Sequence, residues 1–162
     1  MIEARNGRPA RLVLGLGCER GTDAAEVISL AEEALMQGGF LPSDLSLVAS
    51  LDTRAHEPAM RAAAGHFGIP FITFDAARLE QETSRLASPS TVVFAHTGCH
   101  GVAEGAALAA SGPSGRLAVT KIRSPHATAA IAESDQLFAE NSSQGESASL
   151  HSDSTDGEGT VR

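Results

Sequence analysis

The fold of this chain follows from Arg11-Leu-Val-Leu-Gly-Leu-Gly-Cys-Glu-Arg-Gly-Thr22. Residues 12–16 form a short apolar run typical of a buried strand, and glycines then break that run. Asp23 can cap a helix, and Glu26, three residues later, can complete a capping box before apolar residues at helical spacing. The stretch therefore predicts a strand over residues 11–16 that turns directly into a helix.

Strand-like and helix-like segments alternate along the rest of the chain. Apolar runs and their spacing predict further strands at 45–51, 69–74, 91–95, 117–122 and 127–132, and helices at 57–67, 75–86 and 102–110. Strands separated by helices form parallel βαβ units, whereas the short link between the last two strands allows only an antiparallel pair or a bent continuation. We expect an α/β fold, a three-layer α/β/α sandwich around a mixed, mostly parallel sheet of about five strands.

The ends of the chain differ in composition from its centre. Residues 134–162 consist mainly of Ser, Gly and acid, and they hold six of the chain's twenty Asp and Glu residues. A segment with so few apolar residues cannot offset the entropy of ordering itself, so we expect a disordered acidic tail. Residues 1–10 are expected to form an N-terminal extension, which leaves one domain over 11–133.

Composition excludes several classes of protein. A net charge of −8 has the wrong sign for a general nucleic-acid binder, and a chain without Trp or Tyr is poorly suited to stacking on bases. No apolar run is long enough to span a bilayer, and two cysteines are too few for a disulfide scaffold. We expect a cytoplasmic protein that acts on a small molecule or on another protein, with no nucleic-acid or membrane partner.

Four loops rich in glycine and polar residues follow predicted strands. They cover residues 15–22, 52–57, 96–104 and 121–124. Right-handed crossovers bring the carboxyl ends of parallel strands to one edge of the sheet, where α/β proteins bind ligands. We therefore expect a ligand site in which these loops meet.

Acidic and basic residues in these loops suggest two kinds of chemistry. Asp52, Glu57 and Glu104 could activate water as general bases, or the two glutamates could cap helices. Lys121 and Arg123, followed by a serine, could bind an anionic ligand or protect an edge strand from aggregation.

The glycine-rich turn has a second interpretation. Gly15, Gly17 and Gly21 precede a helix, and Asp52 ends the next strand, as in a dinucleotide site. The last glycine comes one place late, and Glu19 would face the pyrophosphate. A tight turn that needs a positive φ explains the same glycines.

Cysteine and histidine residues also have two interpretations. Cys18 beside Arg20 could be a nucleophile or a small buried side chain. His96, Cys99 and His100 could bind zinc, but the second ligand pair usual for zinc sites is missing. We expect neither a metal nor a cofactor.

Four motifs follow one another along the chain. They are Gly15-Leu-Gly-Cys-Glu-Arg-Gly-Thr22, Ser50-Leu-Asp-Thr-Arg-Ala-His-Glu57, Thr97-Gly-Cys-His-Gly-Val-Ala-Glu-Gly-Ala-Ala107, and Lys121-Ile-Arg-Ser124 with Ala127-Thr-Ala-Ala-Ile-Ala132. In this order they resemble the CobE family, which is homologous to the C-terminal domain of CbiG, the cobalt-precorrin-5A hydrolase of cobalamin biosynthesis. The resemblance covers roughly residues 11–133.

The resemblance also implies site residues. The family pattern extends to Glu57 and Thr128, and it departs at Arg123, where lysine is common, and at His126, in a stretch of small residues. Neither change removes positive charge. The resemblance and the loop positions together suggest ligand binding by Gly15, Gly17, Cys18, Arg20, Gly21, Thr22, Asp52, Gly101, Val102, Glu104, Lys121, Arg123 and Ser124.

The function implied by the resemblance is that of a cobalamin biosynthesis protein. It would bind a corrin-ring precursor of the precorrin or hydrogenobyrinic-acid type, as a carrier or accessory protein alongside other enzymes of the pathway. Such precursors carry acetate and propionate side chains, so their site needs cationic and N–H donors around an apolar floor. The alternative is a hydrolase that opens a precorrin-5-type lactone, with Asp52, Glu57 or Glu104 activating water. A nucleotide-binding domain is the third interpretation.

Overall fold

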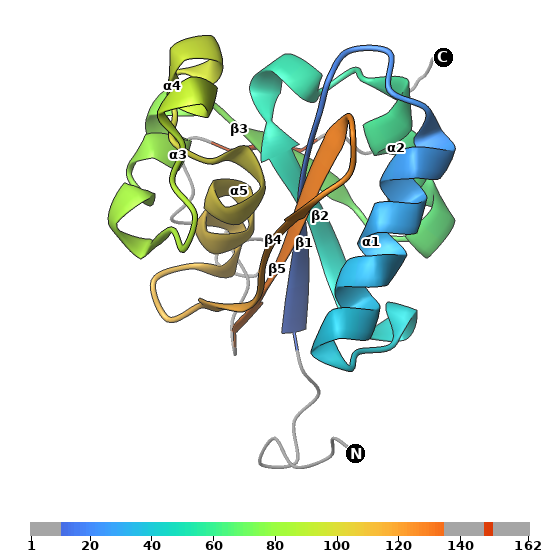
Figure 1. The fold of residues 1–162 in the computed structure, drawn as a ribbon. Coiled ribbons are helices and arrows are strands. Elements are labelled where there is room, and N and C mark those ends of the chain that lie inside the picture. The colour runs from blue at the N-terminus through green and yellow to red at the C-terminus, as the bar shows by residue number, and fades with distance from the viewer. Residues whose placement is uncertain (1–10, 135–147, 151–162) are drawn as a thin grey trace.

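A computed structural model describes residues 11–134 and 148–150, and it contains one six-stranded sheet (Figure 1). The strands are β1 (Arg11–Cys18), β2 (Leu45–Leu51), β3 (Phe71–Phe74), β4 (Arg116–Arg123), β5 (Ala127–Ser134) and β6 (Ala148–Leu150). Their order across the sheet is β4-β5-β1-β2-β3-β6. The central β1–β2 and β2–β3 pairs are parallel, and the other three pairs are antiparallel. The expected mixed sheet is confirmed, with parallel pairing limited to its centre.

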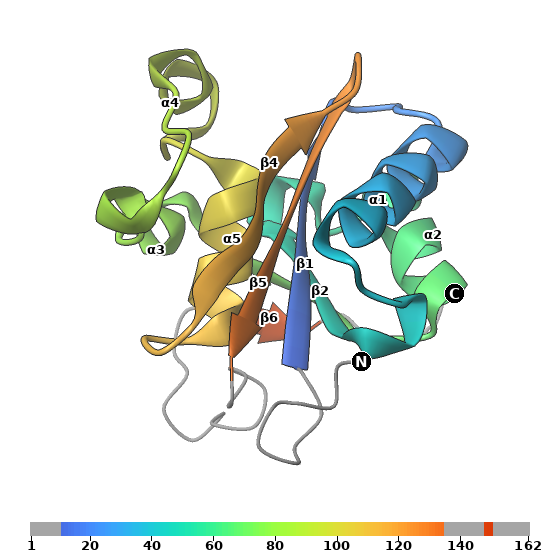
Figure 2. The same ribbon diagram turned by 60° about the horizontal axis from the view of Figure 1, so that its bottom comes forward.

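Helices cover both faces of the sheet, which confirms the three-layer sandwich (Figures 1 and 2). One face carries α1 (Ala24–Gly38) and α2 (Pro58–Phe67), and the other side holds α3 (Ala76–Glu80), α4 (Thr91–Thr97) and α5 (Val102–Ser111). Short 3-10 turns η2 (Pro42–Asp44), η3 (Asp52–Arg54) and η4 (Thr83–Arg85) connect these elements. None of the described helices is long and apolar enough to cross a membrane.

The near-continuous apolar run of β1 is explained by burial on both faces. Leu12, Leu14 and Leu16 belong to the core cluster that contains α1 and α2, whereas Val13 belongs to the cluster that contains α5. Alternate residues of a strand point to opposite faces, so a strand covered on both faces needs apolar or very small residues throughout. The sequence of β1 meets this condition.

Helix α1 begins with the predicted N-cap but without the predicted capping box. Asp23 is the N-cap, and its Oδ1 accepts a hydrogen bond from the Ala25 N–H at 3.2 Å. The capping box predicted with Glu26 is wrong, because that carboxylate accepts hydrogen bonds from the distant residues Ser124 and His126 instead. Gly39, in the left-handed region at φ +74°, ends the helix.

The strand predicted at 91–95 is wrong, because this segment forms helix α4. Its β-branched residues favour a strand locally. Ser90 overrides that preference as an N-cap whose Oγ accepts a hydrogen bond from the Val93 N–H at 3.1 Å. Gly98 ends the helix at φ +85°. The caps at Ser90 and Gly98 therefore outweigh local strand propensity here.

Two other predicted segments are shorter or more ordered than expected. The helix predicted at 75–86 divides into α3 and η4. The segment 148–150 of the predicted disordered tail forms β6, which pairs antiparallel with β3. Strand pairing uses backbone groups, so it can form in a segment with few apolar side chains. The remaining tail residues and residues 1–10 lie outside the described part of the chain.

The strand directions bring several loops to one edge of the sheet. Because β4 is antiparallel to β5 and β5 is antiparallel to β1, β4 runs in the same direction as β1. The ends of β1, β2 and β4 therefore lie at one edge, together with the beginnings of α1 and α5. This is the arrangement expected from the polar loops of the sequence.

Candidate functional site

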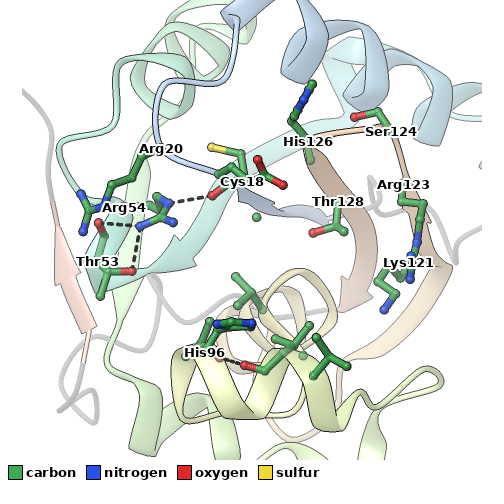
Figure 3. A pocket seen from close by; sticks show the side chains of 18 of the residues that line it. Cys18, Arg20, Thr53, Arg54, His96, Lys121, Arg123, Ser124, His126 and Thr128 are labelled. Atoms are coloured by element: carbon green, nitrogen blue, oxygen red, sulfur yellow. Dashed lines mark hydrogen bonds between the residues drawn. The ribbon is translucent and has the colours of Figure 1, made fainter.

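A cleft of about 760 Å³ opens at this edge, within the size range of small-molecule sites (Figure 3). Its lining comes from the end of β1 and the following loop, from η3, from α4, from the start of α5 and from the β4–β5 hairpin. Segments that are far apart in sequence thus form one continuous surface.

The cleft is cationic although the chain as a whole is acidic. Four cationic side chains line it, Arg20, Arg54, Lys121 and Arg123, whereas the only carboxylate in the described lining is Glu19. Figure 3 shows Arg20 and Arg54 on one side of the cleft and Lys121 and Arg123 on the other. This arrangement suits a ligand with negative groups on opposite edges.

Hydrogen bonds fix the wall that carries Arg54. The Arg54 Nε donates to the Cys18 carbonyl at 2.7 Å, and its Nη1 contacts Thr53. The Glu57 Oε2 accepts from the Gly21 N–H at 2.8 Å. Both bonds tie the β1–α1 loop to the segment after β2, so the wall is built before any ligand arrives.

The opposite wall is the β4–β5 hairpin, and Glu26 of α1 holds its turn. The Glu26 carboxylate accepts hydrogen bonds from the Ser124 hydroxyl and, at 2.8 Å, from the His126 N–H, and it lies 3.0 Å from His126 Nδ1. Hydrogen bonds from Ser124 and then His126 lower the pKa of Glu26 to about 2. The hydrogen bond and the charge of Glu26 in turn raise the pKa of His126.

Two glycines of β1 have different roles beneath the cleft. A Cβ on Gly15 would lie 2.0 Å from the Ala103 carbonyl oxygen, so this glycine lets α5 pack directly on the sheet. A Cβ on Gly17 would lie 2.8 Å from the Thr128 Oγ1 and 3.3 Å from the Val102 Cγ1. Gly17 lines the cleft, whereas Gly15 lies outside the described lining.

The three candidate acids do not meet in the cleft. Glu104 is 1% exposed, and its carboxylate accepts hydrogen bonds from the N–H groups of Ala87 and Ser88 at 2.9 Å and of Lys121 at 2.8 Å. Glu57 is buried and bonded as described above, and Asp52 is exposed at the start of η3. None of the three is among the described lining residues.

The cysteine and histidine candidates show neither an activated thiol nor a metal site among the described residues. Burial and, second, the charge of Glu57 raise the pKa of the Cys18 thiol, so it stays protonated at neutral pH. Cys99 is fully buried, and His100 Nδ1 lies 2.8 Å from Glu80 Oε2. The described residues contain no group of three or more His, Cys, Asp or Glu arranged to hold a metal ion.

The cleft includes part of the predicted site. The predicted residues in its lining are Gly17, Cys18, Arg20, Gly101, Val102, Lys121, Arg123 and Ser124, and those outside it are Gly15, Gly21, Thr22, Asp52 and Glu104. Sequence reasoning assigned no ligand role to Arg54, although it lies in one of the four polar loops. It missed Val92 and Val93, because the sequence predicts a strand for their segment, and it considered His96 only as a possible zinc ligand in the loop 96–104.

Comparisons with known proteins agree on one group of relatives. A family described as "Cobalamin synthesis G C-terminus" matches residues 12–132. The chain is 63% identical to "Protein CobE" of Sinorhizobium sp over 131 residues, 81% of this chain and 85% of that protein. It is 30% identical to "Cobalt-precorrin-5A hydrolase" of Priestia megaterium over 125 residues, 77% of this chain but only 33% of the hydrolase.

Solved structures give the same result. A crystal structure of CobE, a protein of the vitamin B12 biosynthetic pathway, matches with a TM-score of 0.73 at 35% identity, covering 78% of this chain and 92% of that one. The cobalamin biosynthesis protein chiG from Agrobacterium tumefaciens matches with a TM-score of 0.58 at 26% identity, covering 77% and 99%.

Proposed function

We propose that this chain, which belongs to the cobalamin synthesis G C-terminus family and is a protein of cobalamin biosynthesis, binds a corrin-ring precursor as a carrier or accessory protein. The observation that carries the proposal is the cleft with cationic side chains on two sides. Corrin precursors bear several carboxylates around a largely apolar ring, so they need this kind of surface. We also propose a cytoplasmic location, which suits two free cysteines.

The geometry of the acids supports binding rather than catalysis. Glu57 and Glu104 already accept hydrogen bonds from backbone N–H groups, so their carboxylates hold loops in place. The raised pKa of the Cys18 thiol disfavours the thiolate that a nucleophile requires. The described lining is therefore better equipped to hold an anion than to activate water.

A hydrolase that opens a precorrin-5-type lactone is the second candidate. The observation in its favour is the 30% identity to a cobalt-precorrin-5A hydrolase, although the match covers only a third of that protein. In this case Asp52, Glu57 or Glu104 would have to activate water, which requires a ligand pose outside the described cleft lining.

The experiment is a titration of the purified chain with hydrogenobyrinic acid, followed by absorbance and calorimetry. We expect a spectral shift that saturates at one equivalent, with the ligand recovered unchanged. Lys121→Gln and Arg123→Gln should each weaken binding about tenfold or more, because a charge-assisted hydrogen bond contributes about 1.5–3 kcal/mol.

Arg116→Gln is the matched control, because Arg116 lies on the same strand but pairs with Glu133 at the other end of β4. It should bind like the wild type. No spectral response would contradict the proposal, and recovery of a chemically altered corrin precursor would favour the hydrolase. Thermal stabilisation by NAD(P) alone would favour the nucleotide-binding interpretation.

A further inference from the structure

Helix α4 exposes apolar residues that a solvent-facing helix does not need. No residue of α4 is buried, although the helix contains two valines and a phenylalanine. Val92 is 67% exposed and Phe94 is 44% exposed, and both are among the four large exposed apolar side chains of the described residues. Val92 lines the cleft with its neighbour Val93, and adjoining exposed apolar residues mark a binding site more often than a single scattered residue does.

Contacts at its base hold α4 in place without burial. The Phe94 ring stacks on the His100 ring with centroids 4.4 Å apart and planes 20° apart. His100 is fixed by Glu80, which accepts from the His100 N–H at 2.9 Å. The Ser90 N–H donates to the His100 carbonyl at 2.8 Å. The position of α4 is therefore set from one side, while another side of the helix faces the cleft.

The side that faces the cleft is apolar and adjoins the cationic walls. Val92 and Val93 line the cleft together with Val102 of α5. A ligand made only of carboxylates would gain nothing from these valines, and an apolar protein segment would gain nothing from the cations beside them. A flat apolar ring with carboxylates at its edges uses both surfaces.

We infer that α4 forms the ring-binding wall of this site: the face of a corrin-type ring packs on Val92 and Val93 while its carboxylates reach the cations on either side. The inference rests on the proposed function and deepens it, because it separates the residues that bind the ring from those that bind its charges. Covering the valines would remove apolar surface from water, which contributes to affinity in proportion to the area buried.

The test measures the affinity for hydrogenobyrinic acid of the wild type and of Val92→Ser and Val93→Ser. Each substitution should weaken binding about fivefold to tenfold, the loss expected when one or two buried methyl groups are removed. Val92→Ile should bind at least as tightly as the wild type. Met36→Ser is the matched control, because Met36 is 76% exposed in the last turn of α1, outside the described cleft lining, and it should leave binding unchanged.

Citrate, a polycarboxylate without a ring, separates the contribution of the carboxylates to affinity from the contribution of the apolar ring. Citrate should bind more weakly than hydrogenobyrinic acid, and its affinity should fall in Lys121→Gln but not in Val92→Ser.

If the wild type binds hydrogenobyrinic acid and both serine variants bind it equally well, the inference is wrong while the proposed function stands. If the wild type binds no corrin, both are wrong. If the serine variants instead abolish self-association seen by sedimentation, α4 covers a second copy of the chain, and the inference is again wrong.

Discussion

Glu26, Glu57 and Glu104 each accept hydrogen bonds from a segment that borders the cleft, although none of the three is in its described lining. Glu26 holds the turn of the β4–β5 hairpin, Glu57 holds the loop after β1, and Glu104 holds the backbone at Lys121. Carboxylates suit this role because their oxygens accept several N–H groups at once. At the scale of single residues, the acids hold the segments around the cleft and the cations line it.

Glu104→Gln tests whether that carboxylate is structural. An amide offers one oxygen to three N–H groups and turns its own NH₂ toward at least one of them, so we expect the free energy of unfolding to fall by about 1–3 kcal/mol. Urea denaturation measures the free energy of unfolding. The control is Glu33→Gln, at an exposed position, which should change the free energy of unfolding by less than about 0.5 kcal/mol. A variant of normal stability that binds a precorrin lactone but no longer hydrolyses it would instead identify Glu104 as catalytic.

Glu26→Gln should change the pH dependence of stability. The lowered pKa of Glu26 stabilises the fold above pH 4.5, and this contribution is lost as the pH falls toward about 2. The raised pKa of His126 stabilises the fold below pH 6.5, and that contribution is lost as the pH rises through the folded-state value. The decrease in Tm caused by the substitution should therefore be largest between about pH 4.5 and 6.5.

Melting curves from pH 2.5 to 9 measure this difference, and the His126 ring signals in NMR should titrate at lower pH in the variant than in the wild type. Glu33→Gln, the same change on an exposed position of α1, is the control. A Tm difference between wild type and Glu26→Gln that is constant over the whole pH range would show that the hydrogen bonds to the hairpin do not depend on these charges.

At the scale of elements, β1 and α5 pack closely against each other. Gly15 is the residue that permits it, because a Cβ there would lie 2.0 Å from the Ala103 carbonyl and 2.9 Å from the Ala107 nitrogen. Backbone atoms of a helix cannot yield as a flexible side chain can, so any larger residue must push the whole helix outward.

Gly15→Ala should therefore lower the free energy of unfolding by about 1–3 kcal/mol or more. Gly65→Ala is the opposite control, because Gly65 lies inside α2 with no atom within 4 Å of its added Cβ, and alanine should stabilise that helix by about 0.5–1 kcal/mol. Chemical denaturation of the two variants gives the comparison directly. Equal stability of the two would mean that α5 can move away from β1 at no cost.

The elements also show where sequence reasoning succeeds and where it fails. The strand at 11–16 and the first helix could be predicted, because burial on both faces and an Asp N-cap leave clear local signals. The segment 91–95 could not, because its residues favour a strand while Ser90 and the stacking of Phe94 on His100 favour a helix. The stacking joins residues that only the folded chain brings together.

At the scale of the whole molecule, the sequence predicts the edge of the sheet at which the cleft lies, but it predicts only some of the residues that line the cleft. Polar loops after strands predicted the correct edge of the sheet, since β4 does run in the direction of β1. The role of Glu26 was hidden, because its partners Ser124 and His126 lie about a hundred residues away. Local patterns predict which residues start a helix, but not which distant backbone their side chains will hold.

The charge of the chain as a whole is opposite in sign to the charge of its cleft. The chain carries a net charge of −8, yet the described cleft is lined by four cationic side chains and one carboxylate. A polycarboxylate ligand is therefore repelled by the molecule as a whole and attracted only near the cleft. In the bound state the attraction dominates, because it acts over the shorter distance, so salt that screens these charge pairs weakens binding on balance.

We expect the Kd for hydrogenobyrinic acid to rise on the order of tenfold between 50 and 500 mM NaCl, because several charge pairs form on binding. Arg54→Gln and Arg123→Gln should each reduce the slope of log Kd against log salt concentration, whereas Arg116→Gln, at the other end of β4, should not. Calorimetric titrations at four salt concentrations measure these slopes. Equal slopes in all four proteins would mean that the ligand's carboxylates meet neither Arg54 nor Arg123.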